Sequence, residues 1–471
     1  MLENRPKFHF TTQRNWINDP NGLVYLDGQY HLFYQHNPLG NTPGNIGWGH
    51  ALSTDLLHWT EQPMAIAFAN GIMAFSGSVV VDKRNSSGFG TNTLIALFTA
   101  HHTTQALQTQ YLAFSTDQGQ TWTPYEGNPV LDLGQADFRD PKVFWHEPTQ
   151  RWVMLVVLPN EHKVLFYGSS NLKNWDFLSD FGPVGAIDGI WEVPDMFMLR
   201  LEQQEHWVLK IDIGSGALHG GSGGQYFIGQ FDGKRFIADS LETKWLDYGK
   251  DFYAALSFAN LEGVSTANLE GVSTANLEGR HVWLAWMNNW QYAQQTPTSP
   301  WRGAMSIPRE LSLRRTADGF CLVQQPIPEL KTLRTRNFSL ENLQLKNETR
   351  ALPIDGQQLE ILLEFTLETA QEFGFRYGET TIGYDATTQE VFIERPQPDL
   401  EGFAGRHSIV VPLEFGNLQL QIFIDSCSVE VFVQDGLFVL TDLIFPESTG
   451  LELYALDGTV RFRTLVVWEL A

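Results

Sequence analysis

Three carboxylate residues lie in surroundings that hold a side chain stiffly or shield it from water. Asp19 lies in the segment WINDPNG at residues 16–22, where the following proline favours an extended backbone and Asn-Gly permits a sharp turn. Asp140 also precedes a proline, and its neighbour Arg139 favours the ionised form. Glu192 lies in WEVP at residues 191–194, whose apolar side chains disfavour a charge and suit an acid that must hold a proton. Together an ionised and a protonated carboxyl can perform nucleophilic and acid–base chemistry.

Each of these segments also has a plain structural explanation. Asp19 before Pro-Asn-Gly fits an ordinary Asx turn, Arg139 beside Asp140 fits an ion pair, and Glu192 fits a strand-edge residue that faces water. Two other chemistries lack a complete pattern. The adjacent His101 and His102 point to opposite faces of a strand and cannot jointly chelate, and the glycine-rich segment 214–224 misses the dinucleotide-binding spacing.

The elements that must position these groups are predicted to be strands and tight turns. Residues 23–26 and 30–34 form a predicted hairpin, because Asp27-Gly28 between them supplies the positive φ of a tight turn. Residues 142–146 and 151–158 form another around a turn at 147–150. No long amphipathic helix pattern occurs in the first 320 residues. The 15 Trp and 41 Gly also favour an all-β protein with many turns.

A weak repeat organises the first two thirds of the chain. STDLLHW at 53–59 resembles SSNLKNW at 169–175, residues 115–122 are a longer variant, and residues 226–236 are a divergent copy. The first three copies start 62 and 54 residues apart, and each ends one strand and opens the next. Such a period is typical of propeller blades, of which residues 1 to about 320 would hold about five. Coincidental similarity among hairpins is the alternative.

A second repeat is of another kind. The octad ANLEGVST at 259–266 recurs at 267–274 and in part at 275–279, between predicted strands at 253–258 and 281–287. So short a repeat does not make a solenoid. We expect an insertion in a hairpin loop, mobile and functionally neutral, because loops tolerate added length at low entropic cost.

The pattern changes towards the C-terminus. From about residue 340, strands of period two dominate, and they predict a second, all-antiparallel domain, a β-sandwich without an obvious reactive cluster. The expected organisation is a propeller at 1–322, a linker at 323–340 and a β-sandwich at 341–471.

Composition limits the partners. The formal net charge of -23 repels nucleic acid and anionic lipid, and no apolar run approaches membrane-span length, so we expect neither a nucleic acid nor a membrane partner.

Cys321 and Cys427 cannot form a disulfide framework or by themselves a zinc site, and we expect no metal and no cofactor. The first residues lack the apolar core of a signal peptide, which predicts a cytoplasmic protein, or a secreted one whose signal was removed. The oligomeric state stays open.

In combination the motifs resemble glycoside hydrolase family 32, which contains invertases, exo-inulinases and levanases. WINDPNG, Arg-Asp-Pro and WEVP occur in this order, with 121 and 52 residues between their carboxylates. The other segments that resemble the family are YQHNP at 34–38, GWGHA at 47–51, FSGS at 75–78, DFYAA at 251–255, WMNNW at 286–290, VEVF at 429–432 and Thr441-Asp442. The resemblance therefore covers nearly the whole chain.

The resemblance implies a five-bladed β-propeller with a central funnel and an appended β-sandwich. It implies Asp19 as nucleophile, Glu192 as acid/base and Asp140 as transition-state stabiliser. The fructose pocket that it implies is lined by Asn18, Gln35, Trp48, Phe75, Ser76, Arg139 and Trp290. This chain departs from the family at Val193, where a cysteine is usual, and in the octad insertion before the segment 286–290.

The implied activity is the release of terminal fructose from a neutral β-fructoside such as sucrose, inulin or levan. A retaining mechanism through a covalent fructosyl-enzyme is expected, with carboxyls of Asp19 and Glu192 about 5 to 5.5 Å apart. The segment FSGSVVVD at 75–82 favours the exo-inulinases and levanases of the family. A fructosyltransferase that uses the same intermediate is one alternative. A fructan-binding protein without catalysis is another, and the presence of all three carboxylates argues against it.

Overall fold

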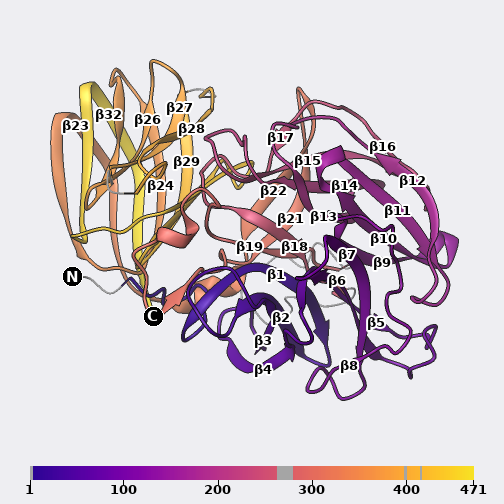
Figure 1. The fold of residues 1–471 in the computed structure, drawn as a ribbon. Coiled ribbons are helices and arrows are strands. Elements are labelled where there is room, and N and C mark those ends of the chain that lie inside the picture. Colours follow the sequence, from indigo (N-terminus) through magenta and orange to yellow (C-terminus); the bar gives the residue numbers. More distant parts are fainter. Residues whose placement is uncertain (1–3, 262–278, 397–399, 414–415) are drawn as a thin grey trace.

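The computed structural model describes residues 4–261, 279–396, 400–413 and 416–471. Its regular elements are almost all strands, arranged as a propeller on the right of Figure 1 and a sandwich on the left. The predicted fold of a five-bladed β-propeller followed by a β-sandwich is confirmed. Most of the octad repeat, residues 262–278, lies outside the described residues, so its expected mobility and neutrality stay predictions.

The first three blades are antiparallel sheets that follow the chain order. Blade one contains β1 (Asn15–Leu26), β2 (Gln29–Asn37), β3 (Gly47–Ser53) and β4 (Thr60–Ile66). Blade two contains β5 (Ile72–Asp82), β6 (Thr93–His102), β7 (Leu107–Ser115) and β8 (Thr123–Pro124). Blade three contains β9 (Arg139–His146), β10 (Arg151–Leu158), β11 (Lys163–Ser169) and β12 (Asp176–Phe181), with the short helices η1 (Glu147–Thr149) and η2 (Pro159–Glu161).

The last two blades complete the ring. Blade four contains β13 (Trp191–Leu201), β14 (Gln204–Ile213), β15 (Gly223–Phe231), β16 (Phe236–Ala238) and β17 (Lys244–Trp245). Blade five contains β18 (Tyr253–Ser257), β19 (Val282–Trp286), β21 (Arg309–Thr316) and β22 (Gly319–Pro326). Between β19 and β21 lie η3 (Ala293–Gln295) and β20 (Trp301–Arg302), and β20 joins the sheet of blade one by parallel pairing with β1. This pairing ties the two ends of the propeller together.

Local sequence explains these elements. The turn between β1 and β2 has positive φ at Asp27 (48°) and Gly28 (88°), as expected for the Asp-Gly hairpin. The weak repeat is structural, since its copies join the third and fourth strands of blades one to four. In three copies the Trp indole N–H donates to a backbone carbonyl of the preceding turn, at 3.0 Å for Trp59, 3.2 Å for Trp122 and 3.1 Å for Trp175.

Apolar side chains fill the spaces between consecutive blades. Trp48 of blade one packs with Phe98 of blade two, and Leu97 of blade two lies in one core with Met154 of blade three. Because each blade buries both faces against its neighbours, the ring holds the first strand of every blade next to the propeller axis.

The second body follows η4 (Pro328–Leu333). Its strands are β23 (Arg334–Asp355), β24 (Leu359–Leu367), β25 (Glu372–Tyr377), β26 (Thr380–Asp385), β27 (Glu390–Arg395), β28 (Gly405–Val410), β29 (Asn417–Asp425), β30 (Ser428–Val433), β31 (Phe438–Leu443) and β32 (Gly450–Leu470). The long β32 pairs with β25 through its first half and with β24 through its second half, and so joins the two layers. The division predicted at residues 322 and 341 stays a prediction.

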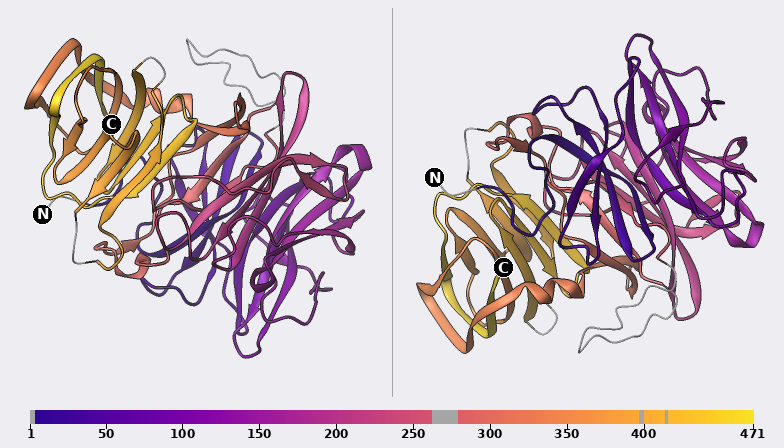
Figure 2. Two further views of the ribbon diagram at one scale, coloured as in Figure 1. Left: turned by 90° about the horizontal axis from the view of Figure 1, so that it is seen from above. Right: turned by 90° about the horizontal axis from the view of Figure 1, so that it is seen from below.

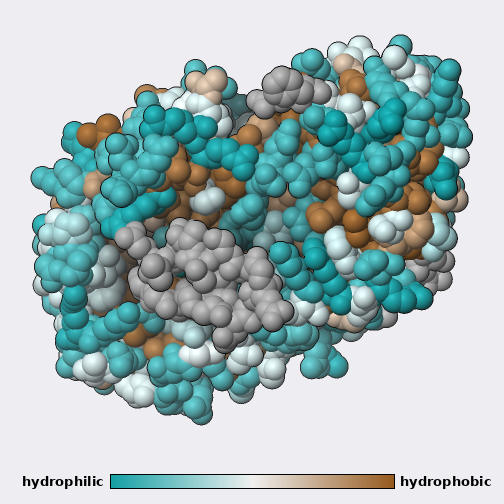
Figure 3. Space-filling model, turned by 180° about the vertical axis from the view of Figure 1, so that it is seen from behind, coloured by the Kyte–Doolittle hydropathy of each residue, from teal (hydrophilic) through white to brown (hydrophobic). Residues whose placement is uncertain are grey.

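The two bodies lie against one another along one side of the propeller, as the views from above and below show (Figure 2). Arg309 of β21 reaches Glu430 of β30 at 2.5 Å, and Arg395 of β27 reaches Asp251, just before β18, at 2.6 Å. The face seen from behind is mainly hydrophilic, with apolar patches between the polar groups (Figure 3). Among the described residues no helix is long and apolar enough to span a membrane.

Candidate active site

The first strand of each blade carries a β-bulge near its beginning, where two residues oppose one residue of the second strand. The bulges are Asn18-Asp19 in β1, Phe75-Ser76 in β5, Asp140-Pro141 in β9, Val193-Pro194 in β13 and Ala254-Ala255 in β18. A bulge bends its strand and re-aims the side chains around it. The five bulges therefore turn side chains from every blade towards one end of the propeller axis, where the contacts below join them.

Asp19 is held by three polar side chains. Its carboxylate accepts hydrogen bonds from Ser76 Oγ at 2.5 Å, from Asn18 Nδ2 at 3.1 Å and from Gln35 Nε2 at 3.2 Å. Burial raises the pKa of Asp19, the donors Ser76 and Asn18 oppose that rise, and the charge of Glu192 adds to it. The structure thus brings together Asn18, Gln35 and Ser76 around one fixed carboxylate, as the resemblance implies.

Glu192 has different neighbours from those expected. The sequence predicted apolar surroundings, but Arg139 Nε donates to Oε1 at 3.1 Å and the Tyr253 hydroxyl donates to Oε2 at 2.5 Å. Burial raises the pKa of Tyr253 well above its usual range, and the charge of Glu192 adds to this effect, so Tyr253 stays a phenol that donates. The Glu192 side chain is 20% exposed, whereas Asp19 as a whole is 6% exposed, so Glu192 is the more accessible carboxyl.

Asp140 lies beside both carboxyls. Its backbone N–H donates to Thr99 Oγ1 at 2.8 Å, and its Oδ2 accepts from the Val193 N–H at 2.9 Å. Burial raises the pKa of Asp140 to about 7; Arg139 opposes this rise, and Glu192 and Asp19 add to it. The effect expected of Arg139 is present, but burial outweighs it. Asp140 is therefore protonated more easily than an exposed aspartate.

Arg139 is itself fixed. Its guanidinium donates to Asp137 Oδ1 at 2.8 Å and to Gln108 Oε1 at 3.2 Å, in addition to Glu192. Because Gln108 is buried and also accepts from the Phe138 N–H at 2.9 Å, the arginine is held from behind. A cation in this place can stabilise negative charge on Glu192 and bind sugar hydroxyls.

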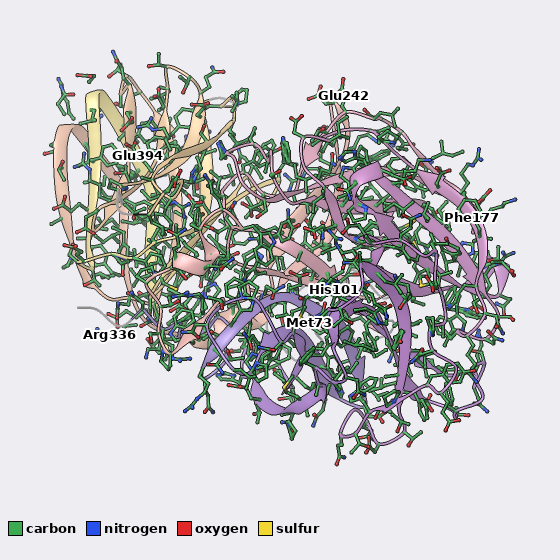
Figure 4. All side chains as sticks on the ribbon, viewed as in Figure 1. Met73, His101, Phe177, Glu242, Arg336 and Glu394 are labelled. Carbon is green, nitrogen blue, oxygen red and sulfur yellow. The ribbon has the colours of Figure 1, made fainter. Side chains whose placement is uncertain are left out.

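Aromatic side chains form a further part of the site. Trp290 follows β19 and packs against Trp286 at 4.8 Å and Trp16 at 5.8 Å between ring centroids. Phe75 stacks on His101 at 4.6 Å with nearly parallel rings. Figure 4 labels His101 of β6 and Met73 of β5, which face each other in the pairing of these two strands, near the middle of the propeller.

Trp48 occupies a less direct position. Its residue exposure is 0%, and its Nε1 donates to the Phe75 carbonyl at 2.9 Å. In this structure Trp48 therefore supports the Phe75 segment from behind, and contact between Trp48 and a sugar stays a prediction.

Three contributors were missed by sequence reasoning. Tyr253 lies in the segment 251–255 that the resemblance singled out, and its place before the bulge of β18 matches the place of Glu192 before the bulge of β13. Lys210 and Asp212, at alternate positions of the otherwise apolar end of β14, are fully buried beside Glu192. Two charged residues in an otherwise apolar strand are the signal by which the sequence could have identified Lys210 and Asp212.

The site contains paired carboxyls, a guanidinium, a phenol and an aromatic wall. Among the described residues, no group of three His, Cys, Asp or Glu side chains is arranged to hold a metal ion. One fixed, buried carboxylate and one accessible carboxyl with hydrogen-bonding neighbours can act as nucleophile and acid/base on a sugar.

Comparison with known proteins gives matches over nearly the whole chain. The family model "Glycosyl hydrolases family 32 N-terminal domain" matches residues 9–326, and "Glycosyl hydrolases family 32 C terminal" matches residues 329–469. The chain is 43% identical to a levanase of Bacillus subtilis (strain 168), over 99% of this chain and 70% of the levanase. It is 38% identical to an extracellular exo-inulinase of Aspergillus awamori, over 99% of this chain and 94% of that protein.

Solved structures agree with this result. The crystal structure of exo-inulinase from Aspergillus awamori superposes with a TM-score of 0.90 at 34% identity, covering 99% of this chain and 98% of that one. A fructofuranosidase from Schwanniomyces occidentalis complexed with fructose superposes with a TM-score of 0.89 at 31% identity, with the same coverage of 99% and 98%.

Proposed function

The chain belongs to glycoside hydrolase family 32, and on this basis we propose that it releases terminal β-D-fructose from neutral β-fructosides with retention of configuration. It is a glycoside hydrolase of the β-fructofuranosidase type. One observation carries the proposed mechanism. Asp19 and Glu192 lie at bulges of different blades, the charge of Glu192 raises the pKa of Asp19, and the charges of both raise the pKa of Asp140.

In the proposed first step, Glu192 gives its proton to the bridging oxygen of the substrate. A carboxylate oxygen of Asp19 forms a bond to C2 of the fructosyl unit, and the bond from C2 to the leaving group breaks. In the second step a water molecule gives a proton to Glu192, and the oxygen of that water forms a bond to C2 as the bond between C2 and Asp19 breaks. Retention requires the two carboxyls to lie about 5 to 5.5 Å apart, the separation expected here.

The surrounding side chains support these roles. Neutral donors orient Asp19, whereas Arg139 and Tyr253 stabilise Glu192 after it has given up its proton. Asp140 is proposed to bind fructosyl hydroxyls as positive charge develops at C2, and Trp290 with Phe75 to line the pocket.

The substrate is proposed to be a fructan or sucrose. The relatives above carry names that refer to levan and inulin, and a levanase is 43% identical to this chain. Initial rates on levan, inulin and sucrose at equal concentrations of fructosyl ends rank these substrates. Product analysis at high sucrose concentration measures transfer to sugar, the activity of a fructosyltransferase.

The residue assignments are tested by Asp19→Asn and Glu192→Gln, which keep size and remove the reactive carboxyl. Each is expected to lower kcat for fructose release by several orders of magnitude. Asp232→Asn, in the turn between β15 and β16, is a control that should keep the wild-type rate. Near wild-type activity of Asp19→Asn would contradict the nucleophile assignment.

The stereochemistry has its own test. With methanol as acceptor, retention gives methyl β-D-fructofuranoside as the transfer product, which NMR identifies because a methyl glycoside does not mutarotate. The α-anomer as first product would contradict a covalent intermediate on Asp19.

A further inference from the structure

A buried lysine–aspartate pair lies beside the catalytic carboxyls, outside the steps proposed above. Lys210 and Asp212 are both on β14 and are fully buried, and the Lys210 ammonium donates a hydrogen bond to the Asp212 carboxyl. Residues two apart on a strand share a face, and Asp212 is the partner of Glu192 in the pairing of β13 with β14. Burying an ammonium group is costly unless its contacts compensate for lost water, so the contacts of Lys210 indicate its role.

Lys210 holds the bulge that follows Glu192. Its ammonium donates to the Val193 carbonyl with an N···O distance of 2.9 Å. Val193 has φ +43°, a conformation that β-branched residues rarely adopt and that surrounding contacts must maintain. The Val193 N–H donates to Asp140, so Asp140 and Lys210 bind the two backbone polar groups of Val193, one on each side of its Cα.

Lys210 also brings positive charge to Asp19. Burial and the charge of Glu192 raise the pKa of Asp19, whereas the charge of Lys210 lowers it, together with the donors Ser76 and Asn18. The other charged groups that face this cluster are Asp140 and Arg139 from β9.

Asp212 does not cancel this charge at mildly acidic pH. Burial raises the pKa of Asp212 to about 8; Lys210 opposes the rise, and Asp19 and Glu192 add to it. Its Oδ1 has no hydrogen-bond partner among the described residues, a costly arrangement for an ionised oxygen. With Asp212 protonated, the field of Lys210 acts on the catalytic carboxyls.

We propose that Lys210 is a positioning residue of this site, whose ammonium group fixes the Val193 bulge that follows Glu192 and brings a positive charge into the cluster of acidic side chains around it. The inference rests on the proposed function, because it assumes that Asp19 reacts in its ionised form. It predicts that the acid limb of kcat/KM, which reports the ionisation of Asp19 in the free enzyme, depends on the charge at position 210.

The test compares pH profiles of three variants. Lys210→Met and Lys210→Gln remove the charge, and Gln keeps a donor for the Val193 carbonyl; both should move the acid limb up by about one pH unit. Lys210→Arg keeps the charge and should leave the limb in place, even where its rate is lower. If Lys210→Met does not fold, Lys210→Gln and Lys210→Arg still give the comparison.

Lys142→Met is the matched control. Lys142 is another buried lysine, which pairs at 2.9 Å with Asp195, the first residue after the bulge of β13, and donates to Ser257 instead of to the Val193 carbonyl. Its loss should lower the melting temperature without moving the acid limb. The inference would be overturned if the acid limb of kcat/KM stayed at its wild-type pH in Lys210→Met and Lys210→Gln, or if it shifted equally in Lys142→Met.

Failure of the proposed function looks different. It would appear as fructose release by Asp19→Asn or Glu192→Gln, whatever the Lys210 variants do. Inactive Asp19→Asn and Glu192→Gln with unmoved limbs in the Lys210 variants would overturn the inference alone.

Discussion

Asp19 and Glu192, the proposed nucleophile and acid/base, show how neighbouring groups suit two chemically similar side chains to different tasks. A nucleophile must be held in one orientation, and Asp19 is nearly buried among short, neutral donors from β1, β2 and β5. An acid/base group must exchange protons with solvent, and Glu192 keeps 20% of its side chain exposed while a guanidinium and a phenol stabilise its anion. The difference follows from which residues flank each bulge.

Tyr253 offers a test at this scale. Tyr253→Phe removes the hydroxyl that donates to Glu192 Oε2 and leaves the buried ring in place. We expect kcat for fructose release to fall by about tenfold, since one charge-assisted hydrogen bond of about 1.5 kcal/mol is lost when Glu192 is an anion. Steady-state kinetics on sucrose or levan measure this loss.

The control removes a phenol hydrogen bond elsewhere. Tyr384→Phe eliminates the bond from a buried hydroxyl of the sandwich to the Val411 carbonyl at 3.1 Å and should leave kcat unchanged. An unchanged kcat in Tyr253→Phe would mean that the phenol does not stabilise the anion of Glu192.

At the scale of elements, strands and turns were predictable because their signals are local. The Asp27-Gly28 hairpin and the strands that contain residues 142–146 and 151–158 formed as predicted, since alternation and turn residues are visible in short windows. The motifs around Asp19, Asp140 and Glu192 likewise fell together at one end of the axis.

The bulges themselves were not predictable. A bulge depends on the register between two strands. Val193 (φ 43°) is β-branched and Asp140 (φ 65°) precedes a proline, so neither position indicates a left-handed backbone in the sequence. The contacts of Glu192 with Arg139 and Tyr253 were also missed, because these side chains meet only when three blades have packed together.

Hydrogen bonds between blades connect these bulges, which leads to a prediction for Thr99. Its Oγ1 accepts the Asp140 N–H at 2.8 Å and donates to Gln110 at 2.9 Å. Thr99→Val has the same shape but leaves a buried N–H without a partner, which should cost about 1–3 kcal/mol in the free energy of unfolding and lower kcat/KM. Urea denaturation and fructose release measure the two effects.

Thr99→Ser keeps the hydroxyl and should retain most of the stability and activity. Equal losses in Thr99→Val and Thr99→Ser would assign the effect to the lost methyl contacts instead of the link between β6 and the bulge of β9.

At the scale of the whole molecule, the sandwich is held to the propeller by buried charges. The segment before β1 places His9 between two sandwich carboxylates, with Nδ1 at 2.8 Å from Asp425 and Nε2 at 2.9 Å from Glu430. Glu430 also pairs with Arg309 of blade five. Since β1, which contains Asp19, begins shortly after His9, this junction anchors the segment that leads into β1.

The ionisation of His9 makes this junction dependent on pH. Burial alone would lower the pKa of His9, but its hydrogen bonds to Asp425 and Glu430 and their negative charges raise it to about 9. A histidine whose pKa rises on folding stabilises the folded state fully below its unfolded pKa of 6.5, and this contribution disappears as pH rises through about 9. The contribution at pH 6 is about 3 kcal/mol.

His9→Gln keeps hydrogen-bonding groups and removes the titration. We expect the stability difference between the wild type and His9→Gln, from urea midpoints followed by tryptophan fluorescence, to be largest at pH 6 and to shrink steadily towards pH 9.5. His58→Gln is the control, because its partner Asp55 lies with it at the surface and screening leaves such pairs little energy. A difference that stays constant or grows with pH would show that His9 is neutral in the folded protein, and the junction would then depend on packing and on Arg309.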